Sequence, residues 1–385
     1  MPWCVKKCPY CDFNSHALKN KLPEEEYIKC LVEDFKQNLS TINQREIQSI
    51  FFGGGTPSLF SAKSIENLLN QLSNLAKFRP DCEITLEANP GTVEQQRFNG
   101  FRKAGINRIS LGVQSFQSNK LKLLGRIHDS DEAHRAIDAI YQAGFDNFNI
   151  DIMHGLPKQT LEDGLYDLNQ AIKHSPTHIS WYQLTIEPNT YFYKHTPVLP
   201  TEEVLYQIEQ QGLDLLKKNN YKRYEISAYA KSSSKQDFKC QHNLNYWLFG
   251  DYLGIGAGAH SKLSQISSNN NAENKLEITR HWNYRSPYSY MESKSKFCSK
   301  MKTLGSDEKI FEFMLNNLRL FQPIEIDLFE KYTGLNKKYI NQSIEIAVSK
   351  NLLKNNKNYI QTTDLGKKFL DDLCQIFLQK EAGIN

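Results

Sequence analysis

The chain has 385 residues, of which 39% are hydrophobic and 23% are charged. This length and composition are typical of a globular protein with one large and one smaller domain, and they exclude a disordered or fibrous chain. The formal net charge is only +4. Because basic and acidic residues are intermixed, nothing in the charge indicates nucleic acid or a membrane surface as a partner.

The first residues carry no apolar core of the kind found in signal peptides, and no apolar run is long enough to span a bilayer. We therefore expect a cytoplasmic protein, in which thiols stay reduced. Three of the eight cysteines crowd near the start of the chain, and the others are scattered singly. This distribution favours one metal site plus ordinary cysteines over a disulfide framework.

The chain opens on a cysteine loop that contains Cys4, Cys8 and Cys11. Three thiolates at this spacing can bind three corners of a [4Fe–4S] cluster and leave one iron free for an outside ligand. Together with His16, the same thiols can form a Cys3His zinc site instead. The cysteines alone leave both interpretations open.

Between Ile47 and Leu184, β-rich apolar runs alternate with amphipathic stretches. This alternation predicts parallel βα units, and hence an α/β sheet or barrel. The expected strands are Ser49–Phe52, Glu83–Leu86, Arg108–Leu111, Phe148–Ile152 and His178–Leu184. The expected helices are Ala62–Ala76, Thr92–Ala104, Ser130–Ala143 and Leu161–Lys173.

Polar and glycine residues stand at the carboxyl end of each expected strand. Because these ends meet at one face of a barrel, they predict a binding face there. Without Cβ atoms, the backbone of a glycine turn can approach a charged ligand closely. The strand-end residues are Gly53–Thr56, Glu87–Asn89, Gly112–Gln114, Asp151 and Thr185–Glu187.

The second half of the chain has a different pattern. Lys231–Asp237 is expected to be a polar loop, and the Asn/Ser-rich Ser264–Lys275 a surface loop. From Met301 the chain regains helical periodicity and ends in a small hairpin and a helix over Leu365–Leu378, which predicts a winged-helix-like module. We expect a barrel over residues 1–230, a bridging segment over 231–300 and a C-terminal helical domain over 301–385.

The Cys-x3-Cys-x2-Cys spacing and the Gly-Gly-Gly-Thr-Pro turn at 53–57 resemble the radical S-adenosylmethionine (SAM) superfamily. The resemblance implies a partial TIM-like (β/α)6 barrel with a [4Fe–4S] cluster on Cys4, Cys8 and Cys11. The open iron would bind the amino and carboxylate groups of SAM, and one-electron reduction would then release a 5′-deoxyadenosyl radical. Such reduction implies an electron donor such as flavodoxin or ferredoxin.

Over nearly its whole length the chain is similar to the family of the anaerobic coproporphyrinogen III dehydrogenase and its HemW-like relatives. The resemblance implies that Gly54, Gly55 and Thr56 contact the methionyl end of SAM and that Glu87 and Asp151 bind the ribose. It also implies that Gln114 lies near the nucleoside and that Arg126 pairs with the methionyl carboxylate. Taken singly, the carboxylates can instead be helix caps and Arg126 a surface cation. Their joint position at successive strand ends favours the ligand site.

Two features resemble the HemW-like branch. Phe13 stands where the dehydrogenases carry a further cysteine, and His242 to Trp247 match a His-Asn-x-x-Tyr-Trp motif. The branch implies a haem chaperone, with haem and haem-accepting proteins as partners and His242, Tyr246 and Trp247 as haem residues. The structural alternative is that His242 hydrogen-bonds locally and Trp247 anchors a domain interface.

Other functions remain as alternatives. They are an oxygen-independent coproporphyrinogen III dehydrogenase, another radical reaction such as methyl transfer, and a zinc-stabilised binding protein. Family members also carry a strand before the cysteine loop, whereas this sequence starts at Met1-Pro2-Trp3-Cys4. Either the true start lies upstream of Met1, or the first strand of the barrel is missing. In the second case we expect an unpaired edge on the neighbouring strand and a cysteine loop tethered at one end only.

Overall fold

The computed structural model describes residues 1–92, 95–232, 236–268, 274–294, 296–356 and 358–378. Its main sheet has seven strands in the order β3-β4-β5-β6-β7-β9-β8. The parallel strands are β3 (Ile47–Phe52), β4 (Phe78–Ala88), β5 (Arg108–Gln114), β6 (Phe148–His154) and β7 (His178–Gln183). The antiparallel strands β9 (Ala228–Lys231) and β8 (Tyr221–Arg223) complete it beside β7.

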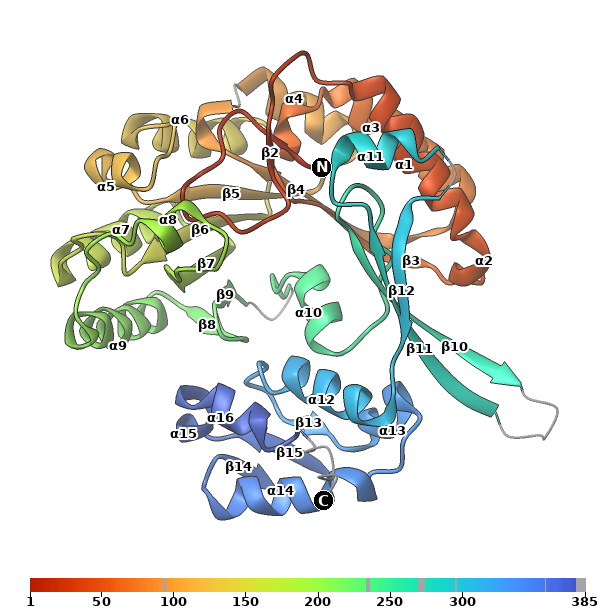
Figure 1. Cartoon of the computed structure of the whole chain (residues 1–385). Helices are drawn as coiled ribbons and strands as arrows, with labels where there is room; N and C mark the ends of the chain where they lie inside the picture. Colours follow the sequence, from red (N-terminus) through yellow and green to blue (C-terminus); the bar gives the residue numbers. More distant parts are fainter. Residues whose placement is uncertain (93–94, 233–235, 269–273, 295, 357, 379–385) are drawn as a thin grey trace.

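Helices cover the convex side of this curved sheet (Figure 1). The helices of the βα units and those beside them are α1 (Glu24–Gln37), α2 (Leu39–Ile42), α3 (Ala62–Leu75), α4 (Gln95–Lys103), α5 (Ser118–Leu123), α6 (Ser130–Gln142), α7 (Leu161–Lys173), α8 (Tyr191–Lys194) and α9 (Glu202–Lys218). Short 3-10 turns, η1 (Pro57–Leu59) and η2 (Pro90–Thr92), follow the first two parallel strands. α10 (Gln241–Trp247) lies instead on the concave side (Figure 1).

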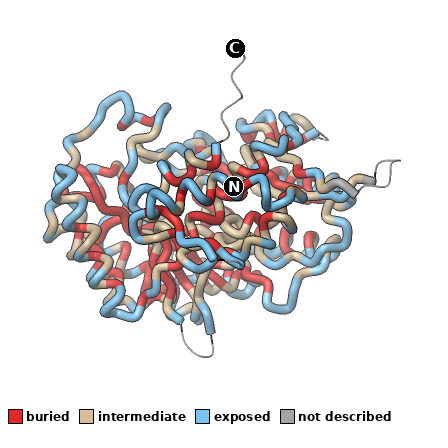
Figure 2. Tube along the Cα trace, turned by 90° about the horizontal axis from the view of Figure 1, so that it is seen from below, coloured by how far each residue is buried: buried red, intermediate tan, exposed pale blue. Residues whose placement is uncertain are grey.

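The predicted α/β class and parallel βα order are confirmed. Every residue of β5 is buried, as expected for a parallel strand that is covered on both faces. The outer helices bury one apolar face against the sheet, for example Ile65, Leu68 and Leu72 of α3. Buried positions run through the middle of the molecule, whereas the outer surfaces of loops and helices are exposed (Figure 2).

The N-terminal segment is held at both of its ends. β1 (Trp3–Cys4) pairs in parallel with β2 (His16–Ala17). The Met1 ammonium donates to the Gly53 carbonyl at 2.8 Å, and the Gly55 amide donates to the Met1 carbonyl at 2.8 Å. The expectation of a cysteine loop tethered at one end only is therefore wrong, because backbone bonds to the glycine turn hold its other end.

In the part of the chain that the structure describes, no strand pairs with the outer edge of β3. The expectation of a loop over Ser264–Lys275 is wrong for its two ends, because residues 264–268 and 274–275 belong to the strands of a long hairpin. Residues 269–273 lie outside the described ranges. A three-stranded antiparallel sheet contains β10 (His260–Ser268), β11 (Asn274–Asn283) and β12 (Cys298–Thr303), with α11 (Pro287–Glu292) between the last two. The expected loop over Lys231–Asp237 includes the undescribed residues 233–235, and Ser232 and Asp237 form an isolated β-bridge.

The C-terminal module has its own hydrophobic core, built around Phe313, Ile344 and Ile360. Its helix–strand order is that of a winged helix, and the predicted hairpin is present. The expected last helix is divided at Phe369, and residues 379–385 lie outside the described ranges. The elements are α12 (Ser306–Asn317), β13 (Ile324–Glu325), α13 (Asp327–Thr333), α14 (Lys338–Ser349), β14 (Leu353–Asn355), β15 (Tyr359–Thr362), α15 (Asp364–Lys368) and α16 (Leu370–Gln375).

No helix within the described ranges is both long enough and apolar enough to cross a membrane.

Candidate functional site

The cysteine loop lies beside the glycine turn that follows β3. The Thr56 hydroxyl donates to Cys4 Sγ at 3.5 Å, and the Thr56 amide donates to the Trp3 carbonyl at 2.7 Å. Cys4, Cys8 and Cys11 are all half-buried free thiols. Burial raises the pKa of Cys4, and the neighbouring Cys11 and Cys8 add to the rise. The three predicted ligands therefore gather at one place, within reach of solvent.

Two further segments clamp this loop. The Phe192 amide of α8 donates to the Pro9 carbonyl at 3.0 Å, and the Tyr10 and Phe192 rings pack with centroids 6.4 Å apart. On the other side, a Cβ added to Gly125 would lie 2.7 Å from Pro9 Cδ. Only a glycine lets the chain after α5 approach so closely, so the loop conformation depends on residues far away in the sequence.

Arg126 joins the cysteine loop to the sheet. Its Nη1 lies 3.6 Å from Cys8 Sγ, and its Nη2 donates to Asn89 Oδ1 at 2.5 Å and to the Gly112 carbonyl at 2.8 Å. Its Nε is buried and has no hydrogen-bond partner. A half-buried cation with a spare donor beside three thiols suits a negatively charged cluster and an acidic ligand group.

The alternative zinc site has little geometric support. His16 Nε2 lies 3.3 Å from Asn14 Oδ1, within a local hydrogen bond. Among the described residues, no group of three or more His, Cys, Asp or Glu side chains is arranged to hold a single metal ion.

The two predicted ribose ligands stand on neighbouring parts of the same face. Glu87 Oε2 accepts the Gly54 amide at 3.1 Å, while Asp151 accepts from Ser110 at 3.1 Å and from Asn149 at 2.8 Å. Burial raises the pKa of Glu87 to about 7, and the charge of Asp151 adds to the rise. Burial also raises the pKa of Asp151. Two partly desolvated carboxylates are thus ready to accept hydroxyl donors.

Gln114 and Asn89 complete this face. Gln114 has a left-handed backbone with φ +69°, and its Oε1 accepts the Tyr182 hydroxyl at 2.9 Å. Asn89, which the sequence did not single out as a ligand, links Arg126 to Thr56 through a 3.0 Å bond to Oγ1. The only sequence signal for Asn89 was its place at a strand end.

The motif residues on α10 divide between two environments. The His242 ring stacks on Phe51 at 4.6 Å and meets Tyr246 edge-on at 4.8 Å. Burial and the nearby Arg108 lower the pKa of His242 to about 4, so its imidazole is neutral at physiological pH. Trp247 instead packs against Arg319, whose guanidinium carbon lies 4.4 Å from the centroid of the indole ring. His242 and Tyr246 thus lie together, and Trp247 faces the C-terminal module.

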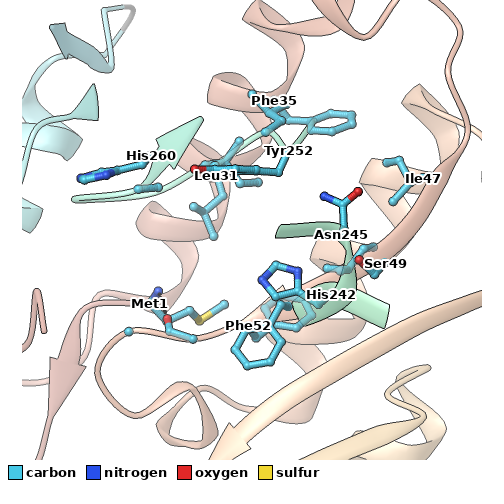
Figure 3. A pocket seen from close by; sticks show the side chains of 18 of the residues that line it. Met1, Leu31, Phe35, Ile47, Ser49, Phe52, His242, Asn245, Tyr252 and His260 are labelled. Carbon is cyan, nitrogen blue, oxygen red and sulfur yellow. Dashed lines mark hydrogen bonds between the residues drawn. The ribbon is translucent and has the colours of Figure 1, made fainter. Parts of the chain in front are cut away.

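A groove of about 670 Å³ runs along the open edge of β3, and His242 lines it. Figure 3 shows His242, Ser49 and Phe52 on one side of the groove, and Leu31 and Tyr252 on the other. The groove extends to Met1, Gly54 and Glu87. It therefore connects the α10 motif with the glycine turn. Cys240, by contrast, is fully buried.

Comparisons with known proteins identify the family and the fold. A family model described as the Radical SAM superfamily matches residues 1–169, and one described as the HemN C-terminal domain matches residues 304–369. The solved structure of coproporphyrinogen III oxidase (HemN) from Escherichia coli has a TM-score of 0.80 at 20% identity and covers 98% of this chain and 88% of that one. At that identity the likeness concerns the fold.

The matched family model and the fold define a radical SAM protein, a class that implies a [4Fe–4S] cluster and SAM as cofactors. The chain is 48% identical to a Haemophilus influenzae protein named "Heme chaperone HemW", over 99% of this chain and 97% of that protein. It is 45% identical to the Escherichia coli protein of the same name, over 98% and 96% of the two chains. This chain belongs to the HemW family.

Proposed function

We propose that this chain is a haem chaperone, which binds haem and passes it to acceptor proteins on a scaffold that holds a cluster and SAM. The full-length relatives named heme chaperone HemW support the class of function. The observation that carries the proposal for this chain is the neutral His242 imidazole in the wall of the groove, beside two aromatic rings.

At the cofactor site, we propose that Cys4, Cys8 and Cys11 hold the cluster. The bound cluster would supply electrons to SAM at its open iron. Gly54, Gly55 and Thr56 would receive the methionyl end, because this turn lies directly beside the cysteine loop, with the Thr56 hydroxyl 3.5 Å from Cys4 Sγ. The guanidinium of Arg126, with its spare Nε, suits the methionyl carboxylate.

The nucleoside end of SAM would contact the neighbouring strands. Glu87 and Asp151 would accept the ribose hydroxyls, and Gln114 would lie near the base. Gln114 is held by the Tyr182 hydroxyl, which fixes the direction of its side-chain amide. We keep flavodoxin or ferredoxin as the proposed class of electron donor for the cluster.

For haem, we propose His242 as the axial ligand and Tyr246 as a flat apolar contact. A neutral imidazole has a free lone pair for iron, and aromatic rings offer favourable surface to a porphyrin. The contact between Trp247 and Arg319 argues for a different role of Trp247, as an anchor of the C-terminal module.

The test is a haem titration of the anaerobically reconstituted protein, followed by the Soret band. His242→Ala should weaken haem binding about tenfold or more, a loss of at least about 1.4 kcal/mol. His195→Ala is the matched control, because this imidazole is exposed and its ring packs on Tyr191, away from α10. Equal affinity in wild type and His242→Ala would remove His242 as the ligand.

A further inference from the structure

α10 begins at a carboxylate from another element. Its N-cap residue, Cys240, makes no side-chain capping bond. Glu83 of β4 instead accepts the Gln241 amide at 3.2 Å and the His242 amide at 3.3 Å, and Cys240 Sγ lies 3.4 Å from its Oε1. The first amides of the helix, which have no partner within the helix, are therefore satisfied by a charge fixed on the sheet.

Glu83 is itself buried and paired. Only 7% of its surface is exposed, and Arg108 of β5, with 2% exposed, places its Nε 4.0 Å from Glu83 Oε2. That Nε has no hydrogen-bond partner. Removing one member of such a pair leaves the other as an uncompensated buried charge, so the pair holds Glu83 in one position.

A second anchor comes from Tyr224. Its hydroxyl accepts the Cys240 amide at 3.3 Å and lies 2.9 Å from His178 Nε2 on β7. The start of α10 is thus fixed to two strands that lie apart in the sheet. Since the His242 amide is one of the groups held, the position of the His242 ring depends on these anchors.

We propose that Glu83 is a positioning residue, which fixes the start of α10 and thereby orients the His242 imidazole toward haem iron. The inference rests on the proposed haem function. Residues that orient a metal ligand through a hydrogen bond affect metal affinity and the electronic state of the metal without touching it. Glu83 belongs neither to the His242–Trp247 motif nor to the strand-end residues that the sequence singled out.

The test compares Glu83→Gln with wild type in the full chain. Gln keeps one acceptor oxygen but loses the charge that attracts Arg108 and the second acceptor. We expect haem affinity to fall roughly ten- to a hundredfold, as for other residues that support a metal ligand. We also expect the ferric haem to change from one His-ligated species to a mixture in electron paramagnetic resonance.

Glu225→Gln is the matched control. Glu225 is similarly buried, at 3% exposure, and accepts the Ser227 amide at 2.9 Å. It pairs with Arg319, which packs on Trp247 at the far end of α10, but among the described residues it makes no hydrogen bond to the start of α10. If Glu83 had only a general structural role, both variants would lower the unfolding temperature and neither would alter the haem spectrum of the folded protein. A spectral change in Glu83→Gln alone supports positioning.

Should Glu83→Gln fail to fold, Tyr224→Phe tests the same idea by removing the single oxygen of the second anchor. It should shift affinity and spectrum in the same direction, by less. Wild-type haem affinity and spectrum in either folded variant would overturn the inference while His242→Ala still weakens binding. If His242→Ala bound haem as tightly as wild type, His242 would not be the haem ligand, and both the proposed ligand and the role of Glu83 would be overturned.

Discussion

At the scale of residues, the candidate SAM site consists of polar groups at strand ends that are hydrogen-bonded to one another. Asn89 connects Thr56 to Arg126, and Arg126 reaches Cys8. Glu87 is bound to the Gly54 amide. A change at one of these groups therefore acts on a network, and the most informative variants keep the shape of the side chain.

The raised pKa of Glu87, about 7, predicts a pH dependence of SAM binding. The ionised carboxylate accepts two ribose hydroxyls better than the protonated acid does. SAM affinity should therefore be full above this pKa and fall as the pH drops through it. Glu87→Gln, which cannot ionise, should bind SAM more weakly and with little change over the same range. Calorimetric titration between pH 6 and 8, roughly one unit on each side of that pKa, measures this; an equal slope in both proteins would contradict it.

The cluster assignment predicts that Cys8→Ala loses the iron–sulfide absorbance after anaerobic reconstitution. A [4Fe–4S] cluster with one ligand left unassigned needs all three remaining thiolates. Cys298→Ala is the control, because Cys298 is also a half-buried free thiol but lies on β12. Iron and sulfide analysis gives the readout. Retention of iron and sulfide by Cys8→Ala would contradict the assignment, and zinc without sulfide in the wild type would revive the zinc site.

Sequence reasoning found the strand-end residues because their place after apolar runs is local information. It missed Glu83, whose partners Cys240 to His242 lie about 158 positions away, the separation of its bond to Gln241. A charged residue at the start of an expected strand was the available signal, for Glu83 as for Arg108. In the structure Glu83 lies in the middle of β4, whereas Arg108 is the first residue of β5. Such long-range pairs follow from the packing of α10, which no local pattern specifies.

At the scale of elements, the N-terminal segment packs against the glycine turn and is bonded to it through the backbone. Gly55 donates its amide to Met1, and an added Cβ there would lie 2.5 Å from the Trp3 carbonyl oxygen. Gly54 has φ +115°, which side chains rarely adopt. The small residues of the turn thus let the cysteine loop dock against it.

Gly55→Ala should displace the cysteine loop, because the backbone atom in its way cannot rotate aside. We expect a loss of unfolding free energy of roughly 1–3 kcal/mol and a lower iron content after reconstitution. Gly305→Ala is the control, since its Cβ would meet only Glu308 Oε2, at 3.8 Å. Denaturant unfolding and iron analysis measure the two effects. Full iron content in a folded Gly55→Ala protein would show that the loop tolerates the methyl group.

Helices and strands whose hydrophobic residues recur at a regular period could be predicted from the sequence. Strands whose residues are mostly polar could not. The helix over Leu161–Lys173 has the predicted bounds, and the parallel strands differ by a few residues. The ends of β10 and β11 that fall within Ser264–Lys275 were taken for a loop because they consist mostly of Ser, Asn and Lys. The pairing of β1 with β2 involves only two residues on each strand and has no sequence signature.

At the scale of the whole molecule, α10 lies between the sheet and the C-terminal module (Figure 1). Phe51 of β3 meets its His242, and Arg319, which follows α12, covers its Trp247. Phe249, just after α10, belongs to the core of the C-terminal module and packs edge-on against Phe313. One short helix therefore carries the proposed haem ligand and ties the two cores together.

This arrangement predicts that Trp247→Phe affects stability more than haem binding. The contact of Arg319 with the larger indole would weaken, at a cost of roughly 0.5–2 kcal/mol. Haem affinity should stay at the wild-type value, because the indole lies outside the groove. Thermal unfolding and Soret titration of the same sample separate the two effects. A loss of haem affinity at unchanged stability would instead make Trp247 a haem contact.

The most direct test of the central claim is haem binding by the reconstituted wild-type chain, run beside an anaerobic assay with coproporphyrinogen III, SAM and reductant. The account predicts a saturable Soret change that ends at equimolar haem, and no accumulation of protoporphyrinogen. The absence of saturable haem binding together with protoporphyrinogen formation would contradict it, and would identify the chain as an oxygen-independent coproporphyrinogen III dehydrogenase.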